Sequence, residues 1–315
     1  MRPITLVKNS RKYIYIGIIL VVAVITVTTT LVLAFSKSGN PFTRTKTDST
    51  KMKPVDPTES YNQIVKPEDK SPISVSQENI KNGKAIHVPV LMYHHIGTAP
   101  ATADATHKGL TVSSEEFEKQ IKYLKDNGYE SVSMNGLYNK IKNEVYKWPK
   151  KPVIITFDDG YTDVFENAIP ILNKYGYTGT FGIITEFPGQ TQGDNFYASW
   201  DQIQSAQKEG MEIVCHSQNH FDGSNPKFTA DYIYQNLSGC QKDLIAHLGE
   251  AEPYLIYPYG HFTPAYVSQA LKSGFVMAFT VHEGSYINTE DLMHIPRVRV
   301  NPNQTMEKFI EKLNS

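Results

Sequence analysis

Between residue 86 and the C-terminus, short apolar runs alternate with longer stretches in which apolar residues recur at helical spacing. The short runs are rich in β-branched residues and predict strands near residues 88–95, 129–132, 151–157, 178–183, 211–215, 254–257, 275–280 and 298–300. The longer stretches predict helices near residues 113–128, 163–175 (interrupted by Pro170), 199–208 and 231–248, and after Asn303. This regular alternation favours an α/β barrel over a β-sandwich.

The run Lys151–Phe157 is continuous, short and rich in β-branched residues, as expected for a strand buried on both faces. Asp158 and Asp159 follow directly, at the carboxyl end of the strand, where α/β folds and barrels place their chemistry. Asp163 and Glu166 have the spacing of a capping box for the next helix. The sequence therefore predicts two adjacent carboxylates at the rim of the barrel.

A pair of histidines, His216 and His220, begins where the predicted strand Met211–Cys215 ends. Histidines four residues apart can face one ion, and imidazole combined with carboxylate suits zinc, with cobalt, nickel or iron(II) as alternatives. Three protein ligands leave a position for water, which is typical of a catalytic zinc site. The alternative interpretation is an ordinary turn and two ordinary loop histidines. The occurrence of both motifs at strand ends favours the metal site.

Three motifs together resemble the polysaccharide deacetylases, a family also named for its chitooligosaccharide deacetylase homology domain. They are Thr156–Gly160, His216–His220 and Tyr257–Gly260, and the similarity runs from Val88 to the C-terminus. The resemblance implies an irregular barrel of about seven or eight β/α units. It also implies hydrolysis of N-acetyl groups on the N-acetylglucosamine units of a polymer.

The resemblance implies a role for each matching residue. Asp158 would be the general base, and Asp159 would hold a divalent metal ion, with zinc favoured, together with His216 and His220. Two such close carboxylates repel each other, and a cation on one of them relieves the repulsion. The cation would polarise water and the acetyl carbonyl. Tyr259 would donate its backbone N–H to the developing oxyanion, in a proline-aromatic loop that also places Pro258 at the substrate.

The general acid is less directly indicated, because the family's usual late Leu-x-His element is absent from this sequence. The strand 88–95 ends in His94 and His95, which is similar to a permuted branch of the family that acts on poly-β-1,6-N-acetylglucosamine. In that branch the last strand of the barrel comes first in the chain. We therefore expect His94 to be the acid, with His95 and His294 as alternatives.

Two further residues are candidates for supporting roles. The family's usual arginine before the third motif is replaced by the uncharged stretch Tyr254–Tyr257. Arg297 could orient the base from a neighbouring strand instead, or it could form a structural ion pair. Trp200 could stack on a sugar in the substrate groove, or it could pack into the core at a helix start marked by Ser199.

Composition narrows the class of protein further. The formal net charge is −1 over 315 residues, and there is no basic stripe or zinc-finger cysteine spacing, so a nucleic-acid partner is not expected. Cys215 and Cys240 are the only cysteines. We interpret both as free, packed thiols, with a disulfide between them as the alternative.

The N-terminal 85 residues predict where in the cell the protein lies. Tyr13–Phe35 carries no charge and is long enough, at about 1.5 Å per residue, to cross a hydrocarbon core of roughly 30 Å. Basic residues before it favour a cytoplasmic N-terminus. We expect a cytoplasmic tail at 1–12, an uncleaved anchor at 13–35, a flexible polar linker at 36–85 and an extracytoplasmic catalytic domain at 86–315. Cleavage near Ala34–Ser36 is the alternative.

Three functions fit these observations. The favoured one is a membrane-anchored N-deacetylase of an extracellular or cell-wall glycan. The second is a catalytically weak carbohydrate-binding relative of the same fold. The third, a zinc peptidase, is disfavoured because Ser217 stands where the common peptidase motif has a glutamate. The sequence leaves open which glycan is the substrate and which oligomeric state the protein adopts.

Overall fold

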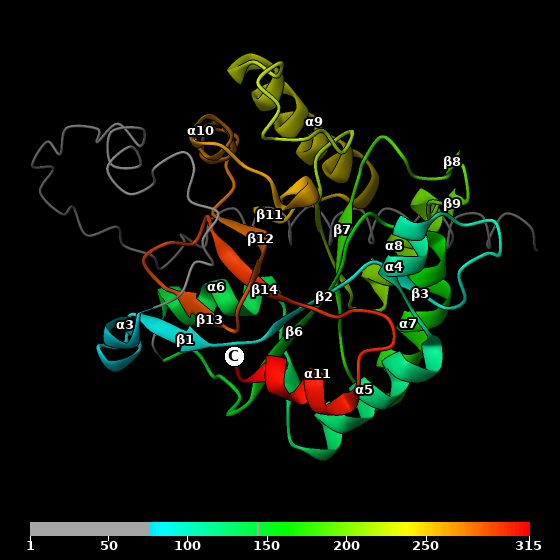
Figure 1. The fold of residues 1–315 in the computed structure, drawn as a ribbon. Helices are drawn as coiled ribbons and strands as arrows, with labels where there is room; N and C mark the ends of the chain where they lie inside the picture. The colour runs from blue at the N-terminus through cyan, green and yellow to red at the C-terminus, as the bar shows by residue number, and fades with distance from the viewer. Residues whose placement is uncertain (1–75, 144) are drawn as a thin grey trace, which may run out of the picture. The chain divides into compact units, whose positions relative to one another are not determined.

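The computed structural model describes residues 76–143 and 145–315 (Figure 1). The expected tail, the expected anchor Tyr13–Phe35 and most of the expected linker lie outside these residues. Within the described part of the chain, none of the helices has the length and apolar character needed to span a membrane. The last ten residues of the expected linker include helix α3 (Gln77–Lys81) and the first residue of strand β1 (Ala85–His87).

A closed parallel barrel forms the centre of the described structure (Figure 1). Its seven strands are β2 (Val90–Tyr93), β6 (Pro152–Phe157), β7 (Thr180–Ile183), β10 (Glu212–Cys215), β11 (Tyr254–Ile256), β12 (Met277–Glu283) and β14 (Ile295–Arg299). Each strand pairs with the next in chain order, and β14 pairs with β2 to close the ring. The prediction of an α/β barrel is confirmed.

The remaining strands are short and lie outside this ring. β5 (Glu130–Ser131) pairs with the first residues of β6 in parallel, and β1 pairs with β13 (Tyr286–Asn288). β3 (His95–Ile96) pairs with β4 (Thr111–Val112), and β8 (Thr191–Gln192) forms a hairpin with β9 (Asn195–Phe196).

Helices surround the barrel (Figure 1). They are α4 (Ala105–Leu110), α5 (Ser114–Asp126), α6 (Met134–Lys142), α7 (Thr162–Tyr175), α8 (Trp200–Lys208), α9 (Ala230–Leu248), α10 (Pro264–Lys272), α11 (Met306–Leu313) and the single 3-10 turn η1 (Pro258–Gly260). The capping boxes of α5 and α8 begin at Ser113 and Ser199, so both predicted helix starts are confirmed.

Helix α7 differs from its prediction in two ways. It begins after Tyr161 without a side-chain cap, so the capping box expected from Asp163 and Glu166 is wrong. The Asp163 carboxylate instead contacts His95, with 2.9 Å between Oδ2 and Nδ1. The helix also continues through Pro170 without interruption. Its buried face, which includes Leu172 two residues later, packs into the core on both sides of the proline and offsets the lost hydrogen bond.

The core has two layers, because alternate residues of each barrel strand point inward and outward. On β6, Ile154 belongs to the apolar cluster inside the barrel, whereas Val153 and Ile155 belong to the larger cluster beneath the helices. This alternation continues past the carboxyl ends of the strands. It therefore decides which polar side chains reach the mouth of the barrel.

Candidate active site

The strand alternation brings polar side chains from several strands to one end of the barrel. Ile154 and Thr156 of β6 face inward, and Asp158, the next residue in this series, does so as well. The same alternation, continued in steps of two from Val90, Val214 and Ile295, reaches His94 after β2, His216 after β10, and Arg297 and Arg299 on β14. Residues far apart in the chain therefore meet above the apolar interior.

Asp158 is held by a two-pronged ion pair with Arg297. The two terminal guanidinium nitrogens each donate to one carboxylate oxygen at 2.7 Å, and both residues are buried. Arg297 also donates to Thr280 O and to Thr156 Oγ1, so its plane is fixed. Burial alone would raise the pKa of Asp158, but the charge and hydrogen bonds of Arg297 outweigh burial and lower this pKa below its ordinary value. Asp158 therefore stays ionised in a dry site.

His94 lies on the other side of Asp158. Its Nε2 is 3.9 Å from Asp158 Oδ2, and its side chain is largely buried. Burial lowers the pKa of His94 below its ordinary value, and the nearby carboxylates of Asp158 and Asp159 reverse only part of that effect. The imidazole is therefore close enough to share a proton-transfer site with the Asp158 carboxylate.

Asp159, His216 and His220 converge on one point. Oδ1 of Asp159 lies 3.1 Å from Nε2 of His216 and 3.2 Å from Nε2 of His220, and this oxygen accepts no hydrogen bond of normal geometry. His216 Nδ1 lies 2.8 Å from the carbonyl oxygen of Ile256, which is the usual arrangement for an imidazole that binds a metal through Nε2. A buried, unsatisfied carboxylate oxygen facing two imidazole nitrogens fits a divalent cation.

The backbone at this site is unusual. Within the described residues, five non-glycine positions have a positive φ, and four of them belong to the site: Asp159 (74°), Ser217 (64°), His220 (58°) and Tyr259 (58°). Left-handed backbone is costly for residues with a Cβ and persists only where the surroundings impose it. Here it turns each segment sharply at the end of its strand. The turns allow side chains of successive residues, such as Asp158 and Asp159, to serve different parts of one site.

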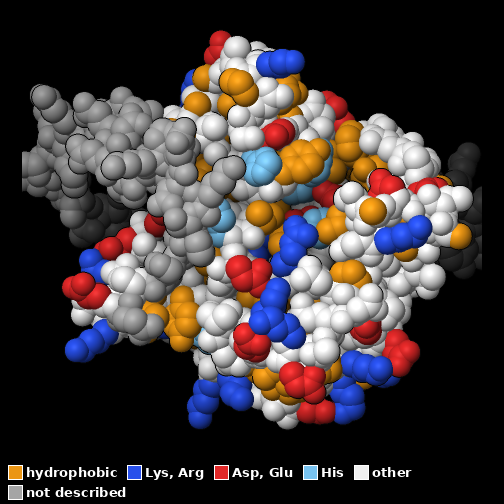
Figure 2. Space-filling view, viewed as in Figure 1, with side chains coloured by type: hydrophobic (Ala, Val, Ile, Leu, Met, Phe, Trp, Pro, Cys, Tyr) orange, Lys and Arg blue, Asp and Glu red, His pale blue; other side chains and the backbone are white. Residues whose placement is uncertain are grey.

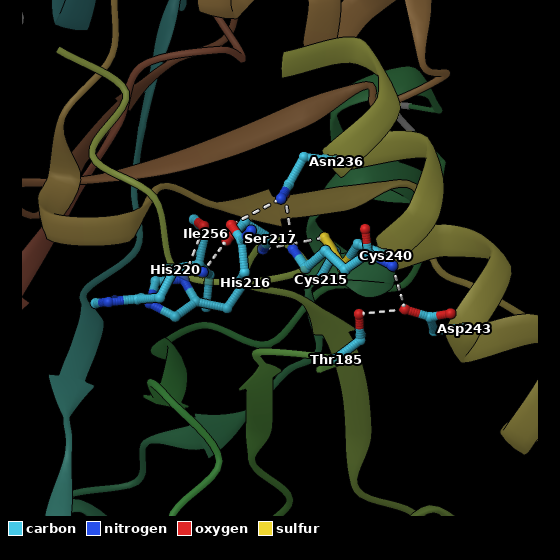
Figure 3. Close-up of a disulfide and its surroundings, with 11 residues drawn as sticks. Thr185, Cys215, His216, Ser217, His220, Asn236, Cys240, Asp243 and Ile256 are labelled. Atoms are coloured by element: carbon cyan, nitrogen blue, oxygen red, sulfur yellow. Dashed lines mark hydrogen bonds between the residues drawn. A yellow bond between two sulfur atoms is a disulfide. The ribbon is translucent and has the colours of Figure 1, made fainter. Parts of the chain in front are cut away.

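The segment His216–His220, which we call the ligand loop, is fastened to α9 (Figure 3). Cys215, directly before the loop, forms a disulfide with Cys240 of α9, so the expectation of two free thiols is wrong. The chain position of the two cysteines could not show that α9 passes behind the end of β10. Asn236 of α9 accepts a hydrogen bond from the Gln218 backbone N–H and donates to the side chain of Asn219.

A second polar contact ties the same loop to α9. Asp243 accepts hydrogen bonds from Thr185 Oγ1 at 2.7 Å and from the Gln218 side chain at 3.0 Å. Gly239 allows this approach, because a Cβ there would lie 2.5 Å from Gln218 Oε1. The helix therefore holds the metal-ligand candidates through one covalent and several polar contacts.

A cavity of about 640 Å³ lies at this end of the barrel, and its lining includes His94, Asp158, Asp159, His216 and His220. Tyr259 forms part of its wall, with its ring 4.4 Å from that of His220 and 54% of its surface exposed. Pro258 is buried and is not among the residues that line the cavity, so the expected place of Pro258 at the substrate is not what the structure shows. The opposite wall comes from the β8–β9 region and includes Asn195 and Tyr197. Figure 2 shows histidine side chains gathered near the middle of one face, beside hydrophobic and basic ones.

Three of the sequence candidates lie elsewhere. His95 is buried between the rings of His107 and Tyr161, at centroid distances of 3.9 and 3.8 Å. His294 pairs with Asp291. Neither histidine lines the cavity that contains His94.

Trp200 also lies outside the cavity lining. Its ring stacks on His247 of α9 at a centroid distance of 4.1 Å, so the packing interpretation describes this tryptophan better than the sugar platform does. Aromatic residues at a helix start give the same sequence signal in both roles. Only the path of α9 distinguishes them.

Sequence reasoning missed the aromatic and basic residues that complete the cavity, above all Tyr161, Tyr197 and Arg299. Two of them carried a readable signal. Tyr161 follows the Asp158–Gly160 turn directly, and Arg299 stands two residues after Arg297 on one strand. Tyr197 carried none, because its place depends on the β8–β9 hairpin.

This combination of a parallel barrel, a buried carboxylate–arginine pair and an Asp-His-His group defines the class of metal-dependent hydrolases. Comparison with known proteins gives the family. The family profile described as "Polysaccharide deacetylase" matches residues 146–278. A "Putative polysaccharide deacetylase YxkH" of Bacillus subtilis is 29% identical over 233 residues, which are 73% of this chain and 77% of the relative.

Two further similar proteins are also deacetylases by name. The "Poly-beta-1,6-N-acetyl-D-glucosamine N-deacetylase" of Staphylococcus aureus (strain MRSA252) is 29% identical over 205 residues, covering 61% of this chain and 69% of that protein. The solved structure of "Streptococcus pyogenes deacetylase PplD in complex with acetate" is 26% identical, with a TM-score of 0.66 over 73% of this chain and 99% of its own. By these matches the chain is similar to the polysaccharide deacetylases, and it is a hydrolase of this kind.

Proposed function

We propose that the protein is a membrane-anchored, zinc-dependent N-deacetylase that removes acetyl groups from N-acetylglucosamine units of an extracellular or cell-wall polysaccharide. The observation that carries this proposal is the meeting of Asp158, His94 and the Asp159–His216–His220 group in one cavity. The names of the Staphylococcus aureus and Bacillus subtilis relatives support the substrate class.

In this proposal, the residues of the chain divide the work of amide hydrolysis. Asp158, kept ionised by Arg297, accepts the proton of the attacking water, and His94 donates a proton to the departing amine. The Tyr259 backbone N–H donates to the oxyanion that develops from the acetyl carbonyl. Asp159, His216 and His220 would hold a divalent cation, which would supply Lewis acidity at that carbonyl.

The geometry argues against a catalytically weak relative. That alternative arose because the sequence alone left the base-orienting arginine and the general acid with competing interpretations. Arg297 makes both hydrogen bonds that such a residue needs, and His94 lies beside the carboxylate. The chain therefore has the parts of a working catalyst.

The proposed location is outside the cytoplasmic membrane, with residues 13–35 as a single anchor. The Cys215–Cys240 disulfide supports an oxidising compartment, because structural disulfides are rare where thiol reductants are abundant. Treatment of intact cells with a protease that cannot cross the membrane tests this location, because an extracytoplasmic domain is digested and a cytoplasmic one is protected.

The decisive test compares His220→Ala with His247→Ala, a matched control on the exposed face of α9. His220→Ala should lose one of three ligands and abolish both bound metal and acetate release from N-acetylglucosamine oligomers. His247→Ala should keep both. Metal content is measured on purified protein by mass spectrometry, and acetate by an enzyme-coupled assay. Full turnover by His220→Ala would refute the proposed metal site.

A further inference from the structure

Arg299 is an arginine that lines the cavity beside the proposed catalytic residues. Arg299 is the last residue of β14 and stands two residues after Arg297, so both side chains leave the same face of the strand. Arg297 is fully buried among its partners, whereas Arg299 is partly exposed and lines the 640 Å³ cavity with His94 and Val281. The two arginines therefore have different environments on one strand.

The charges around Arg299 are unbalanced. Among the residues that the structure describes, the Arg299 guanidinium makes no ion pair or hydrogen bond, and only its backbone oxygen is used, by Lys312 Nζ at 2.8 Å. The Asp158 carboxylate is already neutralised by Arg297. Asp159 faces the two histidines and is the proposed metal ligand. Within residues 76–143 and 145–315, the Arg299 guanidinium is therefore available to a group that enters the cavity.

The position of Arg299 indicates which part of a substrate it meets. β14 pairs with β2, and Arg299 is opposite Met92, two residues before His94. Arg299 is therefore on the same side of the cavity as His94, which is the proposed acid for the departing amine. The amine belongs to the sugar, so a group bound by Arg299 is carried by the sugar and not by the acetyl group.

We propose that Arg299 binds a carboxylate carried by the glycan next to the acetylated amine, so that the site favours acidic N-acetylated polysaccharides over neutral ones. A guanidinium forms paired hydrogen bonds with a carboxylate, a geometry that neutral hydroxyl groups cannot match. This inference rests on the proposed function and specifies its substrate class.

The test uses two tetrasaccharides of alternating N-acetylglucosamine and N-acetylmuramic acid, one with free carboxylates and one with each carboxylate converted to a primary amide. The zinc-loaded protein should show a kcat/KM roughly tenfold higher for the acid form, as expected for a hydrogen-bonded charge pair that is partly exposed. The Arg299→Gln variant should lose this preference, because it should slow the acid form more than the amide form. Arg299→Lys should keep part of it, because a lysine retains the charge but not the paired geometry.

Lys208→Gln is the matched control, since it removes one exposed charge on α8 and should leave the preference unchanged. Equal rates for the two substrates, or equal slowing of both by Arg299→Gln, would overturn the inference. If that variant fails to fold, the unmodified protein still decides, because about 0.5 M salt should weaken an ionic preference and leave a non-ionic one intact.

Failure of the proposed function gives a different result. In that case neither tetrasaccharide releases acetate, and calorimetry then compares the binding of the two forms directly. Equal affinities would refute the role of Arg299 as well, whereas tighter binding of the acid form that Arg299→Gln abolishes would sustain it.

Discussion

The two halves of the active site are held in place by different means. On the base side, Asp158 and Arg297 project from barrel strands and are fixed by a buried ion pair inside the barrel. On the metal side, the ligand loop His216–His220 lies beyond the strand ends and is fixed from outside, by α9. One half depends on charge neutralisation, and the other depends on tethering.

This difference follows from the chemistry that each half performs. A base must be ionised and dry, and only a partner of opposite charge makes a buried carboxylate tolerable. A set of metal ligands must keep its spacing, and the left-handed backbone at Ser217 and His220 resists that spacing. Covalent and polar contacts to a rigid helix compensate for this strain. Substitutions in the two halves should therefore have different effects: those on the base side should expose a buried charge, and those on the metal side should loosen the ligand loop.

The largest effect should come from Arg297→Met. This change leaves Asp158 buried without its counter-charge, which should cost about 3–5 kcal/mol of folding free energy. A misoriented and partly protonated base should also lower kcat by about a thousandfold. Urea unfolding and acetate release measure the two effects. Metal affinity should change little, because Arg297 does not touch the ligand loop.

The double variant Asp158→Asn/Arg297→Met separates the two consequences. With both charges removed, much of the lost stability should return, while activity stays absent. If the double variant is less stable than Arg297→Met alone, the unpaired charge is not the source of the loss.

The next largest effect concerns His94, whose protonation should determine how activity depends on pH. Since burial lowers the pKa of His94, the protonated form that donates to the amine is lost as the pH rises through a value below that of an ordinary histidine. Activity should therefore fall on the alkaline side at a lower pH than an unperturbed histidine would give. His94→Gln should lower kcat by about a hundredfold and remove this limb from the pH profile.

His247→Gln, a change at an exposed histidine, should reproduce the unmodified profile. An alkaline limb that persists in His94→Gln would assign the acid to another group. Because His95 and His294 lie outside the cavity, neither is an obvious replacement.

The sequence predicted the base side better than the metal side. Inward and outward positions follow from a period of two along each strand, so Asp158 could be placed at the barrel mouth from its distance to Ile154. Arg297 was named as a possible partner of the base from its place near a neighbouring predicted strand, with a structural ion pair as the alternative, and in the structure it pairs with Asp158. A period of two within each strand predicts which residues face the barrel interior, even for strands that are far apart in the chain.

The metal side follows no such period. Nothing in the residues Ser217 and His220 specifies a left-handed backbone, because neither is glycine or asparagine. The path of α9 decided both the Cys215–Cys240 disulfide and the stacking of Trp200 on His247, and helix positions around a barrel depend on packing of the whole core. The sequence therefore indicated the candidate ligands Asp159, His216 and His220, but it did not indicate the contacts that hold them in place.

A third prediction tests the covalent part of that support. Cys240→Ala removes the disulfide and should cost about 2–4 kcal/mol of folding free energy. It should also weaken metal binding by about tenfold, because Cys215 directly precedes a ligand and loses its anchor. At saturating metal, kcat should recover, since Asp158 and Arg297 are untouched.

Lys242→Ala, at an exposed position of the same helix, is the control and should change none of these quantities. Cys215→Ala/Cys240→Ala should behave like the single variant, which excludes an effect of the thiol left behind. An unchanged metal affinity in both cysteine variants would show that hydrogen bonds alone hold the loop.

The smallest effect should come from Asn236, the central hydrogen-bonding residue between α9 and the ligand loop. Asn236→Ala leaves the Gln218 backbone N–H without its acceptor in a buried setting, at a cost of about 1–3 kcal/mol. Asn236→Asp keeps that acceptor and loses only the donor to Asn219, so it should be milder. In both variants metal affinity should fall by less than in Cys240→Ala, because the disulfide remains.

Combining Asn236→Ala with Cys240→Ala shows whether the two tethers act on one element. If they restrain the same loop, removal of the second tether should weaken metal binding by more than its effect alone, because the loop is then held to α9 mainly by the hydrogen bond between Gln218 and Asp243. Simple additivity would mean that the disulfide acts on overall stability and Asn236 acts on the loop. Metal titrations of the two single variants and the double variant, at one temperature where all are folded, distinguish these outcomes.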